Sequence, residues 1–399
     1  MIEIKNLRIE KIGTKYKLLA DISSEKNRTD NESTIWISVD EKYKDMLADD
    51  VYDMFLFIPV YLSMYYHEDL HICGSVSKEL YRNVVDYVLY IMKDFKNDLT
   101  IQNIIVDGYK ECDSNPSVIG TGISLGVDCL STIYDRFVNE TDEDYKLTHV
   151  FMLNCGWHGE YGDPKTIELF KARCRYNKQA AEEMGLAFVA VDSNLHAFLY
   201  ELDDRASYFA LYSTIFGLEK KVKKYYISNS YSYDEVSHYG YESRNLDWSE
   251  FADPIALPLM RSASLELVCD GCQYTRVHKT KNIADWDIAR KYLNVCCRHS
   301  NDPGVDESNC SCCTKCNRTL LALDALDKLE DYKDIFDIDI YKRNEAKLKK
   351  EVVDKSERVP FLMEIYNLYG EQGKPLPKHS VKKYLRRVKR AGKIILGKQ

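Results

Sequence analysis

The sequence predicts an α/β protein built on a parallel sheet with helices on both faces, and two observations support this prediction. Between residues 101 and 228, short apolar runs alternate with longer segments of helical periodicity. Strands that are apolar throughout and separated by amphipathic helices are typical of parallel sheets buried on both sides. With 399 residues, of which 45% are hydrophobic, the chain is also long enough for two or three domains and a large core.

Three segments are expected along the chain. They are an N-terminal α+β extension (residues 1–112), a central α/β domain (113–330) and a helical, basic C-terminal tail (331–399). Alternating and apolar runs predict strands at 1–22, 35–39, 101–106, 117–123, 148–153, 187–191 and 224–228. Helical periodicity predicts helices at 51–65, 75–95, 127–138, 165–184, 206–218 and 319–329. Ligands of such a sheet are expected beyond the carboxyl ends of the strands.

The net charge of −8 hides an asymmetry between the tail and the rest of the chain. Nine of the 55 basic residues lie within 378–399, which contains no acid, so the remainder carries 46 basic against 63 acidic residues. A body this acidic is a poor general nucleic-acid platform. The tail is interpreted as a docked helix with a basic face, and contact with RNA or an acidic partner is the less favoured alternative.

The sequence predicts a cytoplasmic protein that does not bind membranes. Its first residues, Met-Ile-Glu-Ile-Lys-Asn, lack the apolar region of a signal peptide, and the longest apolar run, Met54 to Tyr66, is interrupted by Pro59. Thirteen cysteines in a reducing compartment favour metal ligation or thiol chemistry over disulfides. The oligomeric state is left open.

A loop rich in small residues follows the predicted strand 117–123. It reads Gly120-Thr-Gly-Ile-Ser-Leu-Gly-Val-Asp-Cys129 and leads into a predicted helix. Small residues let a backbone approach a ligand closely, and a helix N-terminus presents unpaired N–H groups. The loop is neither a G-x-x-x-x-G-K-[ST] loop nor a G-x-G-x-x-G fingerprint. On these residues alone, an ordinary strand-to-helix turn is an equal alternative.

A cluster of cysteines near the end of the central segment predicts a metal site. Cys310, Cys313 and Cys316 form a C-x2-C-x2-C pattern, and Cys296 or Cys297 can supply a fourth thiolate. Four sulfurs in a tetrahedron with bonds of ~2.3 Å suit a structural zinc ion. A [4Fe–4S] cluster uses the same number of ligands and is the alternative.

The loop and the cysteines together resemble the PP-loop ATP pyrophosphatase (adenine nucleotide alpha hydrolase-like) superfamily, whose loop reads Ser-Gly-Gly-x-Asp-Ser. Ser124, Gly126 and Asp128 match this pattern, whereas Leu125 replaces the first glycine and Cys129 the last serine. The cysteine pattern resembles the 7-cyano-7-deazaguanine synthase family and an uncharacterised bacterial branch of the superfamily. The likeness covers about residues 113–330 and favours Cys296 over Cys297 as the first metal ligand.

The resemblance implies an ATP-dependent enzyme with ATP, Mg²⁺ and Zn²⁺ as cofactors and a small molecule as substrate. A carboxylate or amide oxygen would attack the α-phosphate, pyrophosphate would leave, and the activated carbon would pass to ammonia, an amine or a sulfur nucleophile. The implied nucleotide-binding residues are Gly122, Ser124, Leu125, Gly126, Val127, Asp128, Cys129 and Ser228, with Asp128 also catalytic through Mg²⁺ or the pyrophosphate. The implied zinc ligands are Cys296, Cys310, Cys313 and Cys316.

Two other functions stay open. Leucine restricts a backbone that glycine leaves free, and cysteine donates hydrogen bonds more weakly than serine, so Leu125 and Cys129 allow a catalytically degenerate binding or scaffold protein. A tRNA-modifying (thiolation) enzyme would use the basic tail and the Cys269–Cys272 pair, which is otherwise a metal site or incidental.

Further polar residues are candidates because they follow predicted strands or lie near the cysteines. Asn154, Asn194 and Ser228 fall at the expected ligand edge, although turn chemistry also favours such residues there. Arg276 and Lys279 can neutralise phosphate charge or can be ordinary surface charges.

Overall fold

The computed structural model describes residues 1–26, 32–95, 98–199, 207–239, 251–296 and 309–378. These residues divide into two compact units. Unit 1 contains residues 1–124 and 128–273, and unit 2 contains residues 125–127 together with the described residues from 274 onward. The division expected from sequence, at 112 and 330, stays a prediction.

Unit 1 contains a mostly parallel sheet, which confirms the predicted α/β, Rossmann-like fold. Five strands are mutually parallel and lie in the order β10-β9-β6-β7-β8. They are β6 (Val118–Gly122), β7 (His149–Leu153), β8 (Ala187–Ser193), β9 (Val222–Ser228) and β10 (Glu266–Asp270). β10 was not predicted, because it is only five residues long and carries an acid at each end.

The connections between these strands explain why the sheet is covered on both faces. The helices that link β6 to β9 are α4 (Val127–Ile133), α5 (Pro164–Met184) and α6 (Ser207–Phe216), and α7 (Tyr233–Tyr239) and α9 (Asp253–Ala256) follow β9. The chain runs outward from β6 to β8 and then returns to the opposite side of β6 through β9. Because crossovers are right-handed, the two directions place their helices on opposite faces, as in a doubly wound fold.

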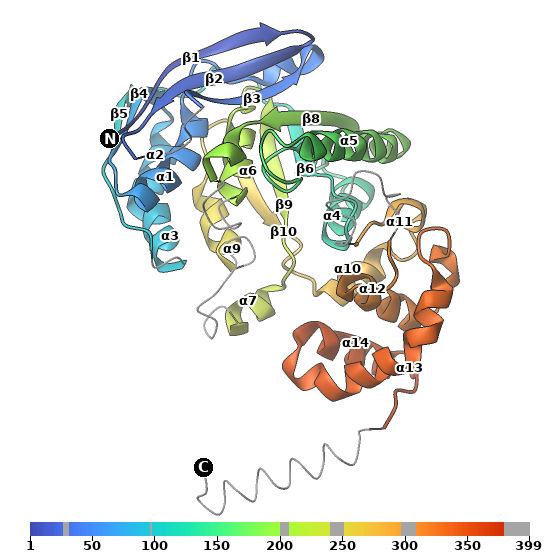
Figure 1. The fold of residues 1–399 in the computed structure, drawn as a ribbon. Coiled ribbons are helices and arrows are strands. Elements are labelled where there is room, and N and C mark those ends of the chain that lie inside the picture. Colours follow the sequence, from blue (N-terminus) through green and yellow to red (C-terminus); the bar gives the residue numbers. More distant parts are fainter. Residues whose placement is uncertain (27–31, 96–97, 200–206, 240–250, 297–308, 379–399) are drawn as a thin grey trace, which may run out of the picture. The chain divides into compact units, whose positions relative to one another are not determined.

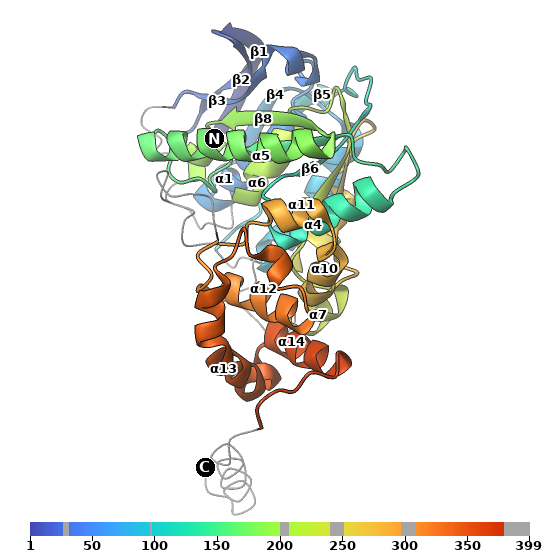
Figure 2. The ribbon, with the colours of Figure 1, turned by 90° about the vertical axis from the view of Figure 1, so that its right-hand side faces the viewer.

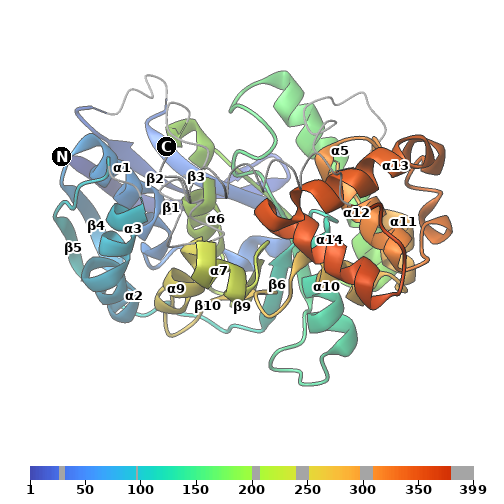
Figure 3. The same ribbon diagram turned by 90° about the horizontal axis from the view of Figure 1, so that it is seen from below.

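The N-terminal extension continues the same sheet. Its strands are β1 (Ile2–Ile12), β2 (Lys15–Ser23), β3 (Thr34–Asp40), β4 (Leu70–Val76) and β5 (Ile104–Tyr109), and its main helices are α1 (Ile58–Tyr66), α2 (Lys78–Asn83) and α3 (Leu89–Phe95). β3 pairs antiparallel with β8, so the order continues β8-β3-β2-β1-β4-β5. Figure 3 shows α1, α2 and α3 beside β4 and β5. One continuous hydrophobic core therefore serves both halves of unit 1.

Unit 2 is helical. Its helices are α10 (Arg276–Ile283), α11 (Asp287–Tyr292), α12 (Thr314–Ala325), α13 (Ile338–Lys355) and α14 (Pro360–Glu371). α10, α12 and α14 contact one another, and α13 packs on α12 and α14 (Figure 2). α12 begins five residues before its predicted start because Cys313 provides its N-cap. The predicted basic tail helix lies outside the described residues. None of the described helices is long and apolar enough to cross a membrane.

Two carboxyl groups, those of Asp53 and Glu219, are buried in unit 1. Asp53 and Glu219 are both 0% exposed. The backbone N–H of Ser77 donates to Asp53 Oδ1 over 2.7 Å, and the Ser262 hydroxyl donates to Glu219 Oε2 over 2.8 Å. The remaining oxygens, Asp53 Oδ2 and Glu219 Oε1, accept no hydrogen bond from another group within the described structure, which suits a proton shared between the two carboxyl groups. Burial raises the pKa of Asp53 from 3.8 to about 6, and burial beside Asp53 raises the pKa of Glu219.

We expect the free energy of unfolding to fall between about pH 4 and pH 6 through this pair. An acid whose pKa is raised by folding binds more protons in the folded state, so its stabilisation is complete below pH 3.8 and is lost as the pH rises through about 6. In urea unfolding, the free energy of unfolding of the wild type should fall by on the order of 2 kcal/mol over this pH range, and this fall should be absent in Asp53→Asn. Asp45→Asn, at an exposed position, should keep it. Equal pH slopes in the two variants would contradict a shared proton.

Candidate functional site

The loop after β6 is closed by the side chain of Cys129. The Ser124 N–H donates to Cys129 Sγ over 3.3 Å, and the thiol donates to the Gly122 carbonyl, also over 3.3 Å. Cys129 is 5% exposed and lies in the first turn of α4, together with Val127 and half-buried Asp128. The thiol thus joins the end of β6 to the start of α4. Cys129, which stands where the PP-loop pattern has its last serine, therefore still links the two ends of the loop.

Leu125 adopts a backbone conformation that normally requires glycine. Its φ is +58°, in the left-handed region, where an L-residue with a Cβ is strained by about 1–2 kcal/mol. The side chain is 0% exposed, and the Asn294 N–H donates to the Leu125 carbonyl over 2.8 Å, both residues lying in unit 2. The position that resembles the first glycine of a PP-loop therefore keeps a glycine-like backbone, and burial of the leucine offsets the strain.

Substitutions at Leu125 should reveal this strain. Leu125→Ala is expected to destabilise the protein by about 2–5 kcal/mol through the lost side chain. Leu125→Gly should be less destabilising than Leu125→Ala by about 1 kcal/mol, because glycine adopts the left-handed region freely. Leu130, which is also 0% exposed but lies within α4, is the matched control. There, Leu130→Gly should be less stable than Leu130→Ala by about 1 kcal/mol, because glycine disfavours a helix. If urea unfolding ranks the glycine and alanine variants in the same order of stability at both positions, the backbone of Leu125 is not strained.

The loop and Ser228 both lie at the point where the strand order reverses. β6 lies next to β9, and the chain reaches β7 and β8 on one side of β6 and β9 and β10 on the other. Gly122 ends β6 and Ser228 ends β9. Tyr225 is 1% exposed, and its hydroxyl lies 3.4 Å from where a Cβ of Gly122 would be. Such a switch point is where ligands of open α/β sheets bind.

A buried ion pair fixes α4 and the segment after it against β10. Asp270, the last residue of β10, is 2% exposed. Its Oδ1 accepts hydrogen bonds from Arg136 Nε (2.9 Å) and Nη2 (2.6 Å), and its Oδ2 accepts one from the Thr132 hydroxyl (2.9 Å). Charge and hydrogen bonding to Asp270 raise the pKa of Arg136 despite burial. Sequence reasoning missed this pair, because 134 residues separate its members.

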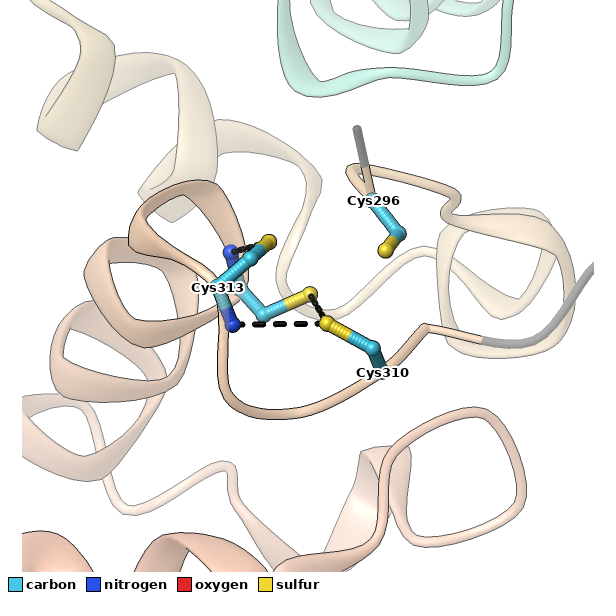
Figure 4. Close-up of side chains that lie close together, drawn as sticks. Cys296, Cys310 and Cys313 are labelled. Atoms are coloured by element: carbon cyan, nitrogen blue, oxygen red, sulfur yellow. Dashed lines mark hydrogen bonds between the residues drawn. The ribbon is translucent and has the colours of Figure 1, made fainter. Parts of the chain in front are cut away.

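Four cysteines of unit 2 can hold a metal ion. The Sγ atoms of Cys296, Cys310, Cys313 and Cys316 all lie within 4.8 Å of one another. Figure 4 shows Cys296 and Cys310 approaching from loops and Cys313 from the start of α12. A tetrahedral ion with metal–sulfur bonds of ~2.3 Å requires sulfurs about 3.8 Å apart, and the Cys310 and Cys316 sulfurs are 3.9 Å apart. Cys297 lies outside the described residues.

Backbone N–H groups and one asparagine shape the cysteine cluster. The Cys313 N–H points to Cys310 Sγ (3.3 Å), and the Cys316 N–H to Cys313 Sγ (3.5 Å). Such N–H groups stabilise thiolates. Asn309 accepts from the Val295 N–H and donates to the Leu293 carbonyl, both over 2.8 Å, so it fixes the segment that carries Cys296 against the loop that carries Cys310.

The segment that carries Cys296 also contacts Leu125, in the loop after β6. Asn294, between the two backbone groups that Asn309 contacts, donates to the carbonyl of strained Leu125. A metal ion on the four sulfurs would therefore also fix the backbone that holds Leu125. Neither Cys312, whose Sγ is 3.7 Å from that of Cys310, nor Cys269 belongs to the four.

The Cys269–Cys272 pair lies close together at the end of β10. The two Sγ atoms are 3.4 Å apart at the end of β10, and Cys272 is 1% exposed. The hydrogen bond with Cys272 and burial raise the pKa of Cys269. Gly271 between them has a φ of +84°, in the left-handed region that favours glycine.

Of the two asparagines expected at the ligand edge, Asn194 has both polar atoms of its side chain hydrogen-bonded to other protein groups. Its Oδ1 accepts from the Trp36 N–H (2.8 Å), and its Nδ2 donates to Glu32 and to the Thr34 carbonyl. Asn194 thus joins β3 to β8. Asn154 donates to Asp192 over 2.7 Å, while its buried Oδ1 has no hydrogen-bond partner within the described structure.

Two buried histidines near the same edge were not predicted. His158 and His196 are 5% and 7% exposed, and burial lowers their pKa values to about 3 and about 4, so both are neutral at neutral pH. The His196 ring nitrogens and His158 Nδ1 have no hydrogen-bond partner within the described part of the chain.

Further along, Lys279 is 0% exposed in α10, so it is not an ordinary surface charge.

Comparison with known proteins adds no relative: no protein-family model, curated protein or solved structure matches this chain. The site is therefore defined by the geometry of the chain itself.

Proposed function

We propose that the protein is an ATP-dependent enzyme that adenylates a carboxylate or amide oxygen of a small molecule and releases pyrophosphate. Ammonia, an amine or a sulfur nucleophile then attacks the activated carbon, and AMP leaves with the oxygen. The observation that supports this proposal best is the left-handed backbone of Leu125, because a conformation that favours glycine lies at the position where the PP-loop pattern has its first glycine. The position of the loop and Ser228 at the strand-order switch supports it independently.

The residues of the loop would contribute positioning and charge neutralisation rather than a covalent nucleophile. Backbone N–H groups of the loop from Leu125 to Cys129 would face the phosphates, as at other helix N-termini that bind anions, whereas the Ser124 N–H donates to Cys129 Sγ. Asp128, in the first turn of α4, orients Mg²⁺ or the pyrophosphate. Mg²⁺, bound by carboxylate and phosphate oxygens, would neutralise charge that a P-loop lysine neutralises elsewhere.

Zinc is the proposed occupant of the cysteine cluster. Sulfurs within 4.8 Å of one another fit a single tetrahedral ion. A four-iron cluster would need more room, because each cysteine then binds a different iron. With four protein ligands the site is closed, so the zinc stabilises the fold and, through Asn294, the position of Leu125.

Pyrophosphate release tests the proposal. Full-length protein with ATP, Mg²⁺, ammonia and a panel of small carboxylates and amides should release pyrophosphate with at least one acceptor. Asp128→Ala should lower this rate by about a hundredfold or more, the size of effect seen when a group that stabilises transition-state charge is removed. Glu143→Ala, an acid on the exposed segment before β7, should keep the rate.

Two outcomes would overturn the proposal. One is a wild-type protein that neither binds ATP nor turns it over, which would favour a degenerate binding or scaffold protein. The other is turnover that Asp128→Ala leaves unchanged.

A further inference from the structure

Cys73, His71 and Asp107 form a row of contacting side chains in the N-terminal part of unit 1. His71 and Cys73 lie two positions apart in β4, so their side chains point to the same face of the sheet. Asp107 lies in β5, which pairs with β4 in parallel. Cys73 Sγ is 3.7 Å from His71 Nδ1, and His71 Nε2 is 2.8 Å from Asp107 Oδ1. Five strands separate β4 from β6, so the row is distinct from the loop after β6.

The contacts of His71 determine which ring nitrogen can take up a proton. A carboxylate only accepts hydrogen bonds, so Nε2 of the neutral imidazole carries the hydrogen and donates to Asp107. Nδ1 is then unprotonated and faces the thiol of Cys73. A nucleophile, a base within reach of it and a third group that orients the base are the parts of a Cys–His–Asp triad. Asp107 would also stabilise the imidazolium that forms when the thiol gives up its proton.

The thiol of Cys73 needs such a base. Partial burial, and then the negative charges of Asp107 and Glu3, raise the pKa of Cys73, so the thiol keeps its proton at neutral pH. The thiolate is the nucleophilic form of cysteine. His71 can therefore form it at the moment of attack by accepting the proton, as a general base does.

A break in the pairing of β4 and β5 lies at these residues. Between Ile72 and Ser75 the pairing advances three residues on β4 but two on β5. β4 therefore carries one extra residue opposite Asp107. Such a β-bulge re-aims side chains and occurs often at sheet edges and beside active sites. β5 is the last strand at this end of the sheet, so the bulge lies at an edge and between the thiol and the carboxylate.

The three side chains are accessible to a molecule in solution. Those of His71 and Asp107 are 29% and 55% exposed, and Cys73 is half-buried. By contrast, Leu70 and Ile72, which alternate with them along β4, are 0% exposed in the core. The row thus lies on the face of β4 opposite the core, where a substrate can reach the sulfur.

We propose that Cys73 is a nucleophile that takes acyl groups from esters or thioesters, with His71 as its general base. His71 Nδ1 accepts the proton of the thiol while the sulfur attacks the carbonyl carbon. The bond from this carbon to the leaving oxygen or sulfur then breaks, and the leaving group takes the proton from His71. Water, deprotonated by His71, hydrolyses the acyl–Cys73 thioester, which releases the acid and returns the proton to the thiol. Esters and thioesters are expected because their leaving groups depart more readily than an amine.

Acetylation by p-nitrophenyl acetate tests this site in the full-length protein. Peptide mass spectrometry should find the acetyl group on Cys73, and the initial burst of nitrophenolate should be absent in Cys73→Ala. His71→Ala should slow acetylation of Cys73 about a hundredfold, the size of effect expected for a general base, and added imidazole should restore part of the rate. His278→Ala, which removes an exposed histidine of α10, should leave the rate unchanged. Because the assay contains no ATP, its failure is distinguishable from failure of the proposed function.

Asp107 is a positioning residue, and conservative substitution tests its role. Asp107→Asn should slow acetylation of Cys73, and Asp107→Glu should keep more of the rate because it retains the negative charge. Equal rates in these two variants would remove Asp107 from the triad.

Cys174, which is also half-buried but contacts no histidine in the described part of the chain, is the internal comparison. Acetylation of Cys73 no faster than that of Cys174, or a rate that His71→Ala retains, would overturn the proposal. The comparison with Cys174 uses the wild-type protein, so it decides the question even if a substitution disturbs folding.

Discussion

Replacing Cys316 with serine should abolish binding of the proposed zinc ion and unfold much of unit 2. Cys316 is 0% exposed, and its sulfur completes the set of four that lie within 4.8 Å of one another. Structural zinc contributes about 10–16 kcal/mol of apparent binding free energy in small zinc domains. Loss of one ligand should therefore lower the stability by more than an ordinary core substitution does. We expect metal content near zero and a loss of at least about 3–5 kcal/mol in stability.

The control for this prediction lies in the same loop. Cys312 is half-buried, and its Sγ is 3.7 Å from that of Cys310, yet it is not among the four. Cys312→Ser should keep the metal and the wild-type melting temperature, measured by mass spectrometry of the metal and by circular dichroism. Equal loss of metal from both variants would contradict the assignment. If Cys316→Ser does not fold at all, a strong chelator added to the wild type should produce the same loss of helix.

The second large effect is expected at Arg136. Truncation to alanine leaves the Asp270 carboxylate, whose side chain is 1% exposed, without its charged partner. Removing one partner of a buried ion pair lowers the free energy of unfolding by about 3–5 kcal/mol. For Arg136→Ala we expect a loss of about 2–4 kcal/mol, because the Arg136 side chain is 28% exposed. The exposed pair of Arg82 and Asp86 is the matched control, and Arg82→Ala should cost less than about 1 kcal/mol.

A second substitution checks the cause. Asp270→Asn in the Arg136→Ala background should recover part of the lost stability in urea unfolding, since it removes the buried charge while keeping the hydrogen bond from Thr132. If Arg136→Ala costs no more than Arg82→Ala, the ion pair does not hold α4 against β10.

Strands β6 to β9 were predictable because they are apolar and the helices between them are periodic. β4 was not predicted, because Gly74 interrupts its apolar residues. In the structure Gly74 lies within β4, and a side chain there would overlap the ring of Tyr52, whose hydroxyl accepts from the Leu7 N–H over 3.0 Å. The glycine therefore marks close packing across the sheet, a cause that local sequence does not carry.

The candidate site was predictable where spacing alone determines geometry. The C-x2-C-x2-C pattern places three sulfurs around one point whatever the rest of the fold, so Cys310, Cys313 and Cys316 could be predicted together. The role of Leu125 was not predictable, because leucine disfavours the left-handed backbone that it adopts. Asn309, the Arg136–Asp270 pair and the buried histidines depend on contacts between distant segments, which one sequence does not reveal.

Calorimetry of Mg²⁺·ATP binding to the metal-loaded protein tests the central claim most directly. We predict clear affinity in the wild type and its loss in Gly126→Asp, which brings a negative charge and a side chain to the loop where the phosphates would bind. Gly373→Asp, at an open position after α14, is the control and should bind as the wild type does. No measurable ATP binding by the wild type, or unchanged binding by Gly126→Asp, would contradict the proposal that this loop is a working nucleotide site.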